Sequence, residues 1–284
     1  MAEASATPTH QQGPPRRALR SLPAAGWVAA SVLVLFSLAA AWPGLFTRYD
    51  PYAIDPAAAL LAPSWAHLFG TDESGRDVFS RVVYGARSSL AIGAGATLLG
   101  MFLAILLGLT AAFCGRAADW SVSRFLEVLF AFPGIVLALV FIALVGSGPV
   151  PMTIAVGIAA APGYARLIRG HGLVVRASGY MEAARVLGDS LPSAVWRHAL
   201  PNILSSVFVV ATLGVGQAVV WASSLSYLGL GVSPPAAEWG AMLNGGRNYI
   251  AFAWWITVFP GLAIVLVAGA ATVLGRVWPS RRAQ

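Results

Sequence analysis

Six long apolar stretches constrain this chain more than any other feature of its sequence. A helix needs about 20 mostly apolar residues to cross the hydrocarbon core of a bilayer. The stretches that meet this requirement are 23–46, 88–114, 125–147, 149–168, 204–231 and 250–275. Only 10% of the residues are charged, whereas soluble domains carry about a quarter. We therefore expect an all-α integral membrane protein with six transmembrane helices.

The arginines predict how these helices are oriented, because positive residues concentrate in short cytoplasmic loops. All 18 basic residues are arginine; 13 lie in one set of alternating segments and five in the other. The first set comprises 1–22, 115–124, 166–202 and 276–284, and the second comprises 47–87 and 232–249. This asymmetry predicts that both termini are cytoplasmic. The same asymmetry explains the pI of about 10, because the positive charges would set the orientation of the chain in the membrane. We therefore expect no nucleic-acid partner.

The predicted organisation follows from these boundaries. We expect a disordered cytoplasmic tail at 1–22, a first transmembrane helix at 23–46, an extracytoplasmic loop at 47–87, a helical core at 88–275 and a cytoplasmic tail at 276–284. The N-terminal arginines and the first apolar run could also imitate a secretory signal. That run is long for a signal peptide and belongs to a chain with several spans, so we expect it to remain uncleaved.

Several chemistries are disfavoured by what the sequence lacks. Without any lysine, the chain cannot supply the lysine of a phosphate-binding P-loop. The single cysteine, Cys114, excludes an intrachain disulfide and a multi-cysteine metal site. The only acidic residue in the six stretches is Glu127. Its position near Arg124, at the start of the third stretch, indicates a residue at the membrane interface; a structural or gating role is the alternative. We therefore expect no catalytic residue, no metal and no cofactor on this chain.

The most informative stretch lies between the fourth and fifth apolar runs, at about 169–203. Ser178 can cap a helix whose first turn holds Glu182, and Gly188 can supply a sharp turn. Asp189 or Ser190 can begin a second short helix, and Pro201 is expected to end it. Two short helices that project from the membrane with small alanines on one face suit a groove on a soluble partner.

This stretch resembles the EAA loop of bacterial ABC importer permeases. The resemblance rests on Glu-Ala-Ala at 182–184, Gly188, and the later His-Ala-Leu-Pro-Asn at 198–202. In that family the loop docks on the ATP-hydrolysing subunit and transmits its closure to the transmembrane helices. The residues that take the coupling role by position are Glu182, Ala183, Ala184, Gly188, His198, Pro201 and Asn202. For His198, local packing at a helix end is the alternative.

Two further stretches narrow the resemblance. Both stretches are similar to those of the second (C-type) permease subunit of dipeptide, oligopeptide and nickel importers. The first comprises 67–81 and 85–90, and the second comprises 225–231, 234–235, 238–240 and 259–261. The similarity runs from about 23 to 275 and implies a type I importer permease fold, with one helix ahead of a five-helix core. From the residues alone, Thr71 or Asp72 can cap a short surface helix in which Asp77 pairs with Arg81.

The resemblance also implies partners. One such chain forms half of a translocation pathway, so we expect a heterodimer with a homologous permease. Two nucleotide-binding subunits, or one fused ATPase, would bind ATP and Mg²⁺, and an extracytoplasmic binding protein would deliver di- or oligopeptides or a similar small solute. The expected location is the bacterial inner membrane.

Two other classes of protein remain as alternatives. A stand-alone channel or secondary transporter would need pore-lining charges or broken midplane helices, and spans this poor in acids argue against ion coupling. An intramembrane enzyme would need a catalytic constellation, and the sequence contains neither an HExxH nor a GxSxG motif.

Overall fold

The computed structural model describes residues 24–277, except for the side chains of residues 205 and 206. The predicted tail at 1–22 and most of that at 276–284 lie outside the described residues. Every named element of residues 24–277 is helical. The elements are α1 (Ala24–Ala41), η1 (Pro43–Leu45), η2 (Pro56–Ala58), α2 (Val78–Phe113), α3 (Arg116–Phe130), α4 (Gly134–Val145), α5 (Pro149–Arg176), α6 (Gly179–Val186), α7 (Leu191–Ala194), η3 (Val195–Ala199), α8 (Leu200–Tyr227), α9 (Trp239–Gly246) and α10 (Trp255–Val277).

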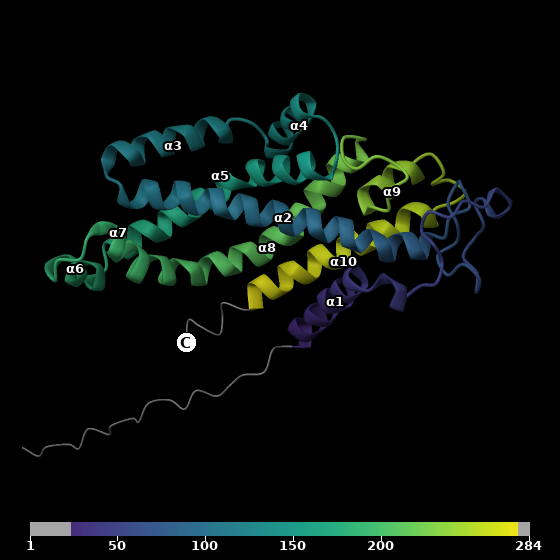
Figure 1. Cartoon of the computed structure of the whole chain (residues 1–284), viewed down its shortest axis with the longest axis horizontal. Coiled ribbons are helices and arrows are strands. Elements are labelled where there is room, and N and C mark those ends of the chain that lie inside the picture. Colours follow the sequence, from purple (N-terminus) through teal and green to yellow (C-terminus); the bar gives the residue numbers. More distant parts are fainter. Residues whose placement is uncertain (1–23, 278–284) are drawn as a thin grey trace, which may run out of the picture.

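Three long helices form the centre of the molecule. Figure 1 shows α2, α5 and α8 side by side, with α10 packed on α8 and α1 packed on α10 and α2. Small residues let α2 and α5 approach closely: a Cβ atom added to Gly100 would lie 2.8 Å from the Gly157 carbonyl oxygen. Close contact through small residues is the usual way in which helices pack inside a bilayer.

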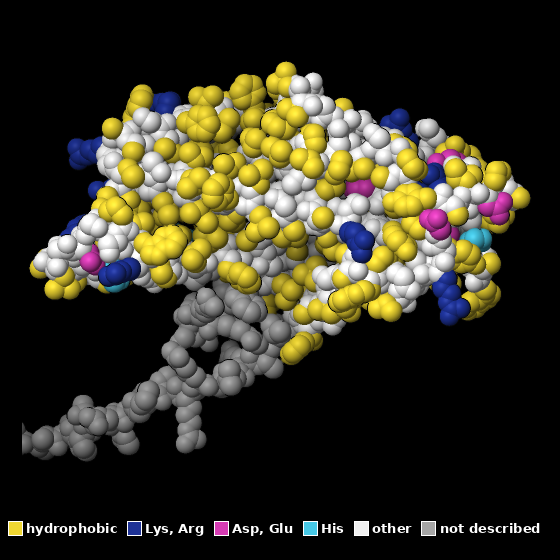
Figure 2. Space-filling model, viewed as in Figure 1, with side chains coloured by type: hydrophobic (Ala, Val, Ile, Leu, Met, Phe, Trp, Pro, Cys, Tyr) yellow, Lys and Arg dark blue, Asp and Glu magenta, His cyan; other side chains and the backbone are white. Residues whose placement is uncertain are grey.

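The surface has the character of a membrane protein. Figure 2 shows apolar side chains across the middle of one face and most of the charged side chains towards its two ends. Five helices are long and apolar enough to cross a membrane: α1, α2, α5, the Val207–Tyr227 part of α8, and α10. A sixth span is present if α3 and α4 are counted together. This agrees with the predicted fold class.

The predicted span at 125–147 is wrong as a single helix. α3 ends at Phe130 and α4 begins at Gly134, and the two are bent by 86°. Pro133 stands directly before α4; proline has no N–H to donate and restricts the residue before it, so the helix cannot run through. By contrast, Pro149, Pro151 and Pro162 do not interrupt α5, which is continuous to Arg176.

The other predicted boundaries need smaller corrections. α2 begins at Val78, ten residues before the expected start at 88, so the second half of the predicted 47–87 loop is partly helical. At 1.5 Å per residue, its 36 residues span about 54 Å and extend beyond the roughly 30 Å core of a bilayer. α1 ends at Ala41 instead of 46, and α10 begins at Trp255 instead of 250.

The start of α2 is organised differently from the expectation. Asp77 does not pair with Arg81; its Oδ1 accepts hydrogen bonds from the Ser80 N–H and hydroxyl, both at 2.7 Å, and thereby caps α2. Arg81 instead lies 3.5 Å from Asp72, with Arg76 bound to the same Asp72 oxygen at 2.7 Å. Both arginines and Asp72 are buried, and buried charges require such partners.

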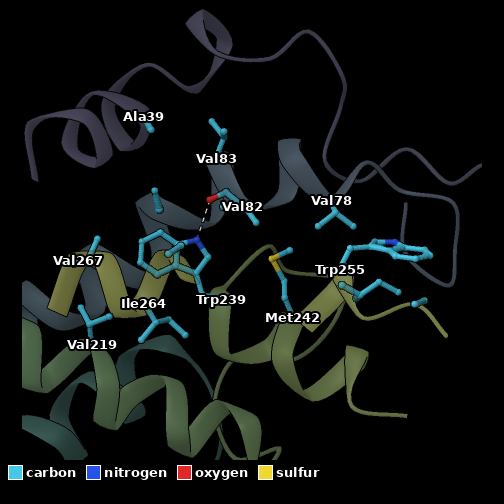
Figure 3. Close-up of a cluster of buried hydrophobic side chains, with 14 residues drawn as sticks. Ala39, Val78, Val82, Val83, Val219, Trp239, Met242, Trp255, Ile264 and Val267 are labelled. Carbon is cyan, nitrogen blue, oxygen red and sulfur yellow. Dashed lines mark hydrogen bonds between the residues drawn. The ribbon is translucent and has the colours of Figure 1, made fainter. Parts of the chain in front are cut away.

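A buried apolar cluster fixes α9 against α2 and α10. Figure 3 shows Trp239 at its centre, with its indole N–H donating to the Val82 carbonyl oxygen at 2.9 Å. The preceding Glu238 is also buried and caps α9 by accepting from the Gly240 and Ala241 N–H groups. The Glu-Trp-Gly motif at 238–240 is therefore an anchor between elements far apart in the sequence.

Candidate functional site

The stretch with the most informative motif forms a separate projection. α6, α7 and η3 make a helical knob (residues 178–199) that lies at the opposite end of the molecule from the segment that joins α1 to α2 (Figure 1). The knob is joined to the bundle through α5 on one side and α8 on the other.

The beginning of α6 differs in detail from the prediction. Ser178 occupies the N-cap position, but its hydroxyl donates backwards to the Val175 carbonyl oxygen and makes no capping bond. Glu182 lies in the first turn, as predicted, and its side chain is exposed. A carboxylate in this position interacts favourably with the positive end of the helix dipole. Glu182 is therefore compatible with the helix and available to a partner.

The two alanines of the motif face in different directions. Ala184 is buried with Met181 in a cluster that also contains Ala194, Ala199 and Ile203. Ala183 is exposed, as are Val186 and Leu187, whose side chains are 83% and 85% accessible. The expectation that both alanines present an outward face is wrong, because positions 181 and 184 share one helix face and 183 lies about 100° away from 184. Ala184 holds the knob together and Ala183 faces outwards.

Gly188 adopts the left-handed conformation that the sequence suggested, with φ of +86°. Its N–H donates to the Arg185 carbonyl oxygen, and the Asp189 N–H donates to that of Ala184. These two bonds form a Schellman motif, the usual ending for a helix that stops at a glycine. No atom would contact an added Cβ there, so glycine is favoured by its backbone conformation alone.

Pro201 does not end the second helix of the knob, contrary to expectation. The chain passes from α7 through the π-helical turn Val195–Ala199 directly into α8, and Pro201 lies in the first turn of α8. Proline removes one backbone donor and crowds the carbonyl one turn earlier. A widened π-turn is a common accommodation inside a helix, and the continuous path makes the knob an extension of α8.

His198 and Asn202 contact neighbours within the knob. His198 Nε2 lies 3.5 Å from Asp189 Oδ2, and the Asn202 amide donates to the His198 carbonyl oxygen at 2.7 Å. His198 is half-buried and Asn202 is exposed. The structure therefore shows local contacts for both residues, as in the alternative considered for His198.

Sequence reasoning missed the exposed apolar side chains of the knob. Val186, Leu187, Leu191 and Trp196 are all exposed, and Trp196 is 72% accessible. The sequence did contain these large apolar residues, in a stretch that we expected to project from the membrane. Exposed apolar surface of this kind marks interaction sites. Val186 and Leu187 lie at the end of α6, which also carries Glu182 and Ala183, whereas Leu191 and Trp196 belong to α7 and η3.

The end of α5 that leads into the knob is bonded to α2 and α3. The Arg176 guanidinium donates to the Ala112 carbonyl oxygen at the end of α2, at 2.8 Å. About two turns before Arg176, Arg169 forms a bidentate ion pair with Asp119 of α3, and Arg166 stacks over the Phe130 ring at 4.1 Å from its centroid. The knob therefore continues from a part of α5 that is bonded to both α2 and α3.

Comparison with known proteins agrees with this architecture. Residues 100–278 match the family described as "binding-protein-dependent transport system inner membrane component". The glutathione transport system permease protein GsiD of Pectobacterium atrosepticum is 42% identical over 250 residues, which cover 87% of this chain and 83% of that protein. The dipeptide transport system permease protein DppC of Alkalihalophilus pseudofirmus is 37% identical, over 86% of this chain and 80% of DppC.

A further relative and a solved structure extend the comparison. The probable D,D-dipeptide transport system permease protein DdpC of Escherichia coli is 39% identical, over 84% of this chain and 80% of DdpC. A structure of the inward-facing MetNI methionine ABC transporter superposes with a TM-score of 0.57 and 20% identity, over 72% of this chain and 95% of the matched chain. This likeness shows the type I importer permease fold. The chain belongs to the family of binding-protein-dependent transport system inner membrane components and is a permease subunit of an ABC importer.

Proposed function

We propose that this permease carries short peptides, or small solutes that resemble them, through a pathway of which it forms one half. The relatives named above are permeases for glutathione, D,D-dipeptides and dipeptides, and each match covers at least 80% of the relative. The other half of the pathway would come from a homologous permease in a heterodimer. A separate extracytoplasmic binding protein would select the cargo and deliver it.

The helical knob is the proposed docking site for the ATPase. Its exposed surface combines the carboxylate of Glu182 and the small Ala183 with the apolar side chains of Val186 and Leu187. The exposed apolar side chains of this projection are the observation that carries the proposal, because a helix that docks in a groove presents such residues. Gly188 would fix the direction of α6, while His198, Pro201 and Asn202 would maintain the base of the knob.

The proposed division of labour leaves the chemistry to the partners. Two ATPase subunits, or one fused ATPase, would bind ATP and Mg²⁺, and this lysine-free chain would perform no catalysis. The contacts from Arg176 to Ala112 and from Arg169 to Asp119 would carry the movement of the knob into the helices that border the pathway. In the inner membrane, the knob and both termini would be cytoplasmic, and the segment between α1 and α2 extracytoplasmic.

The proposal is tested by enlarging the small exposed residue at the proposed joint. Ala183→Trp should overpack the ATPase groove at a cost of about 1–3 kcal/mol, which weakens subunit association about 5- to 150-fold. The variant should insert and pair with the sister permease normally, but lose the ATPase subunits on co-purification and lose ATP-driven uptake.

The matched control is Ala117→Trp, which adds the same side chain at an exposed position of α3, outside the knob. Normal ATPase retention and normal uptake in Ala183→Trp would contradict the docking assignment. Loss of both in Ala117→Trp as well would show that an added tryptophan disturbs the complex regardless of position.

A further inference from the structure

An apolar groove with two polar side chains, Gln217 and Tyr164, lies beside the break between α3 and α4. It has a volume of about 410 Å³ and is bordered by α3, α4, α5 and α8. Neither a carboxylate nor a guanidinium lines it, and apart from the Trp221 indole its only polar side chains are Gln217 and Tyr164. Ligand sites in proteins are typically of this size, mostly apolar, with a few placed polar groups.

Gln217 occupies an unusual position for an amide. It lies ten residues from either end of the apolar stretch Val207–Tyr227, and its side chain is exposed. Within the described part of the chain, its carboxamide makes no hydrogen bond. An amide that faced lipid tails would be costly, since hydrocarbon offers it no partner. Gln217 must therefore meet water, another subunit or the cargo.

Tyr164 brings a second free polar group to the same groove. Its ring lies over Gly214, one turn before Gln217 on α8; a Cβ atom added to Gly214 would lie 2.5 Å from the Tyr164 hydroxyl oxygen. That hydroxyl also makes no hydrogen bond with the described residues. Two polar groups from α5 and α8 thus converge on one wall, although 53 positions separate them in the sequence.

The neighbouring break in the helices supports a water-accessible groove. Phe132 and Gly134, on either side of Pro133, both line it. Non-helical backbone at membrane depth is tolerated only where it is buried in protein or lines a water-filled cavity. The break and the two polar groups are independent observations, and both require that protein or water, instead of lipid, cover this groove.

We propose that this groove is the wall along which the cargo passes, and that Gln217, assisted by Tyr164, hydrogen-bonds a peptide bond of the cargo. A carboxamide offers both a donor and an acceptor, which complement the C=O and N–H of a peptide bond. No charged side chain is among the lining residues, although the Arg166 guanidinium stacks on Phe130, which lines the groove. This inference rests on the proposed function and adds the residues that recognise the cargo.

The first test measures uptake by the assembled transporter with its binding protein, with a labelled dipeptide, a D,D-dipeptide and glutathione as probes. Gln217→Leu should reduce the uptake rate about 3- to 10-fold, the effect of losing roughly one net hydrogen bond, and Tyr164→Phe should reduce it less. Both should retain the sister permease and the ATPases. The control is Thr212→Val, which removes a hydroxyl on α8 that already donates to the Phe208 carbonyl oxygen.

The second test asks directly whether the groove contains water. In a Cys114→Ala background, which removes the chain's single cysteine, Gln217→Cys should react with a water-soluble maleimide, and excess cargo with ATP should slow the reaction. Val219→Cys, two residues away and fully buried, should not react. If the wild type took up none of the probes, the peptide assignment of the proposed function would fail. The labelling result would still show whether water reaches the groove.

Three results would overturn the inference. Unchanged uptake in both Gln217→Leu and Tyr164→Phe would show that neither group meets the cargo. Loss of the sister permease from Gln217→Leu would show that the amide is a subunit contact. Labelling of Gln217→Cys no faster than that of Val219→Cys would show that the groove is closed to water. None of these outcomes depends on the knob, so failure here is distinct from failure of the Ala183→Trp test.

Discussion

The two ends of this molecule handle polar and charged groups in opposite ways. In the 42–77 segment and at the start of α2, Asp72, Arg76 and Arg81 are buried and paired with one another. In the helical knob, Glu182 is exposed and apolar Leu187 is exposed beside it. Both ends expose large apolar side chains, such as Trp65 at 98% and Leu187 at 85% accessibility, so the difference between them is that only the first end pairs buried charges within the chain. The comparison indicates that the first end is held by buried ion pairs, whereas the knob is held by apolar contacts such as those of Met181 and Ala184.

The comparison predicts first that the two ends lie on opposite sides of the membrane, which gives an all-or-none result. A reporter that is active only outside the cytoplasm should be active when fused after Pro56 and silent when fused after Arg185. The physical reason is the arginine asymmetry between alternating segments. The opposite pattern would reverse the assigned orientation, and equal activity at both sites would mean that the spans between them were counted wrongly.

The next largest effect is expected at the end with the buried ion pairs, in the 42–77 segment and the start of α2. Asp72→Leu removes the carboxylate shared by Arg76 and Arg81 and leaves buried charge uncompensated, which typically costs about 3–5 kcal/mol. The fraction of complex that survives a heating series should fall sharply. Glu73→Gln is the control, because its side chain is 31% exposed beside the same Arg76, and a pair of this kind contributes about 0–1 kcal/mol. Equal thermal stability of the two variants would contradict the contrast between the ends.

An intermediate effect is expected at Gly188. Gly188→Val places a β-branched residue at φ of +86°, and strain of this kind costs about 1–3 kcal/mol. α6 should then end incorrectly, so that ATPase retention and uptake fall while the thermal stability of the membrane part stays near wild type. Asparagine tolerates the left-handed region, so Gly188→Asn should keep most of the uptake. A valine variant as active as the asparagine variant would show that the direction of α6 is not important.

The smallest effect is expected at His198. Its contact with Asp189 is 3.5 Å long and half-exposed, and such pairs contribute about 0–1 kcal/mol. His198→Gln should therefore change ATPase retention by less than about fivefold. A loss as large as that of Ala183→Trp would instead show that His198 contacts the ATPase directly, which would move the boundary of the docking surface towards the base of the knob.

What the sequence determined here is local. Hydrophobicity, the charge at each end of a span and the left-handed preference of glycine are properties of single residues or short runs. For that reason the membrane class, the position of the knob and the turn at Gly188 could be predicted. The EAA motif, which carries the family resemblance, is likewise contained in one short stretch.

The tertiary structure decided everything that depends on distant neighbours. Ala184 is inward and Ala183 outward because α6 packs on residues from α7 to α8. Arg81 pairs with Asp72, whereas the two carboxylate oxygens of Asp77 are bound by the cap of α2 and by His67. The groove between Tyr164 and Gln217 exists only because α5 and α8 meet beside a broken helix. Such pairings depend on how separate elements come together in space, and short-range periodicity carries no information about them.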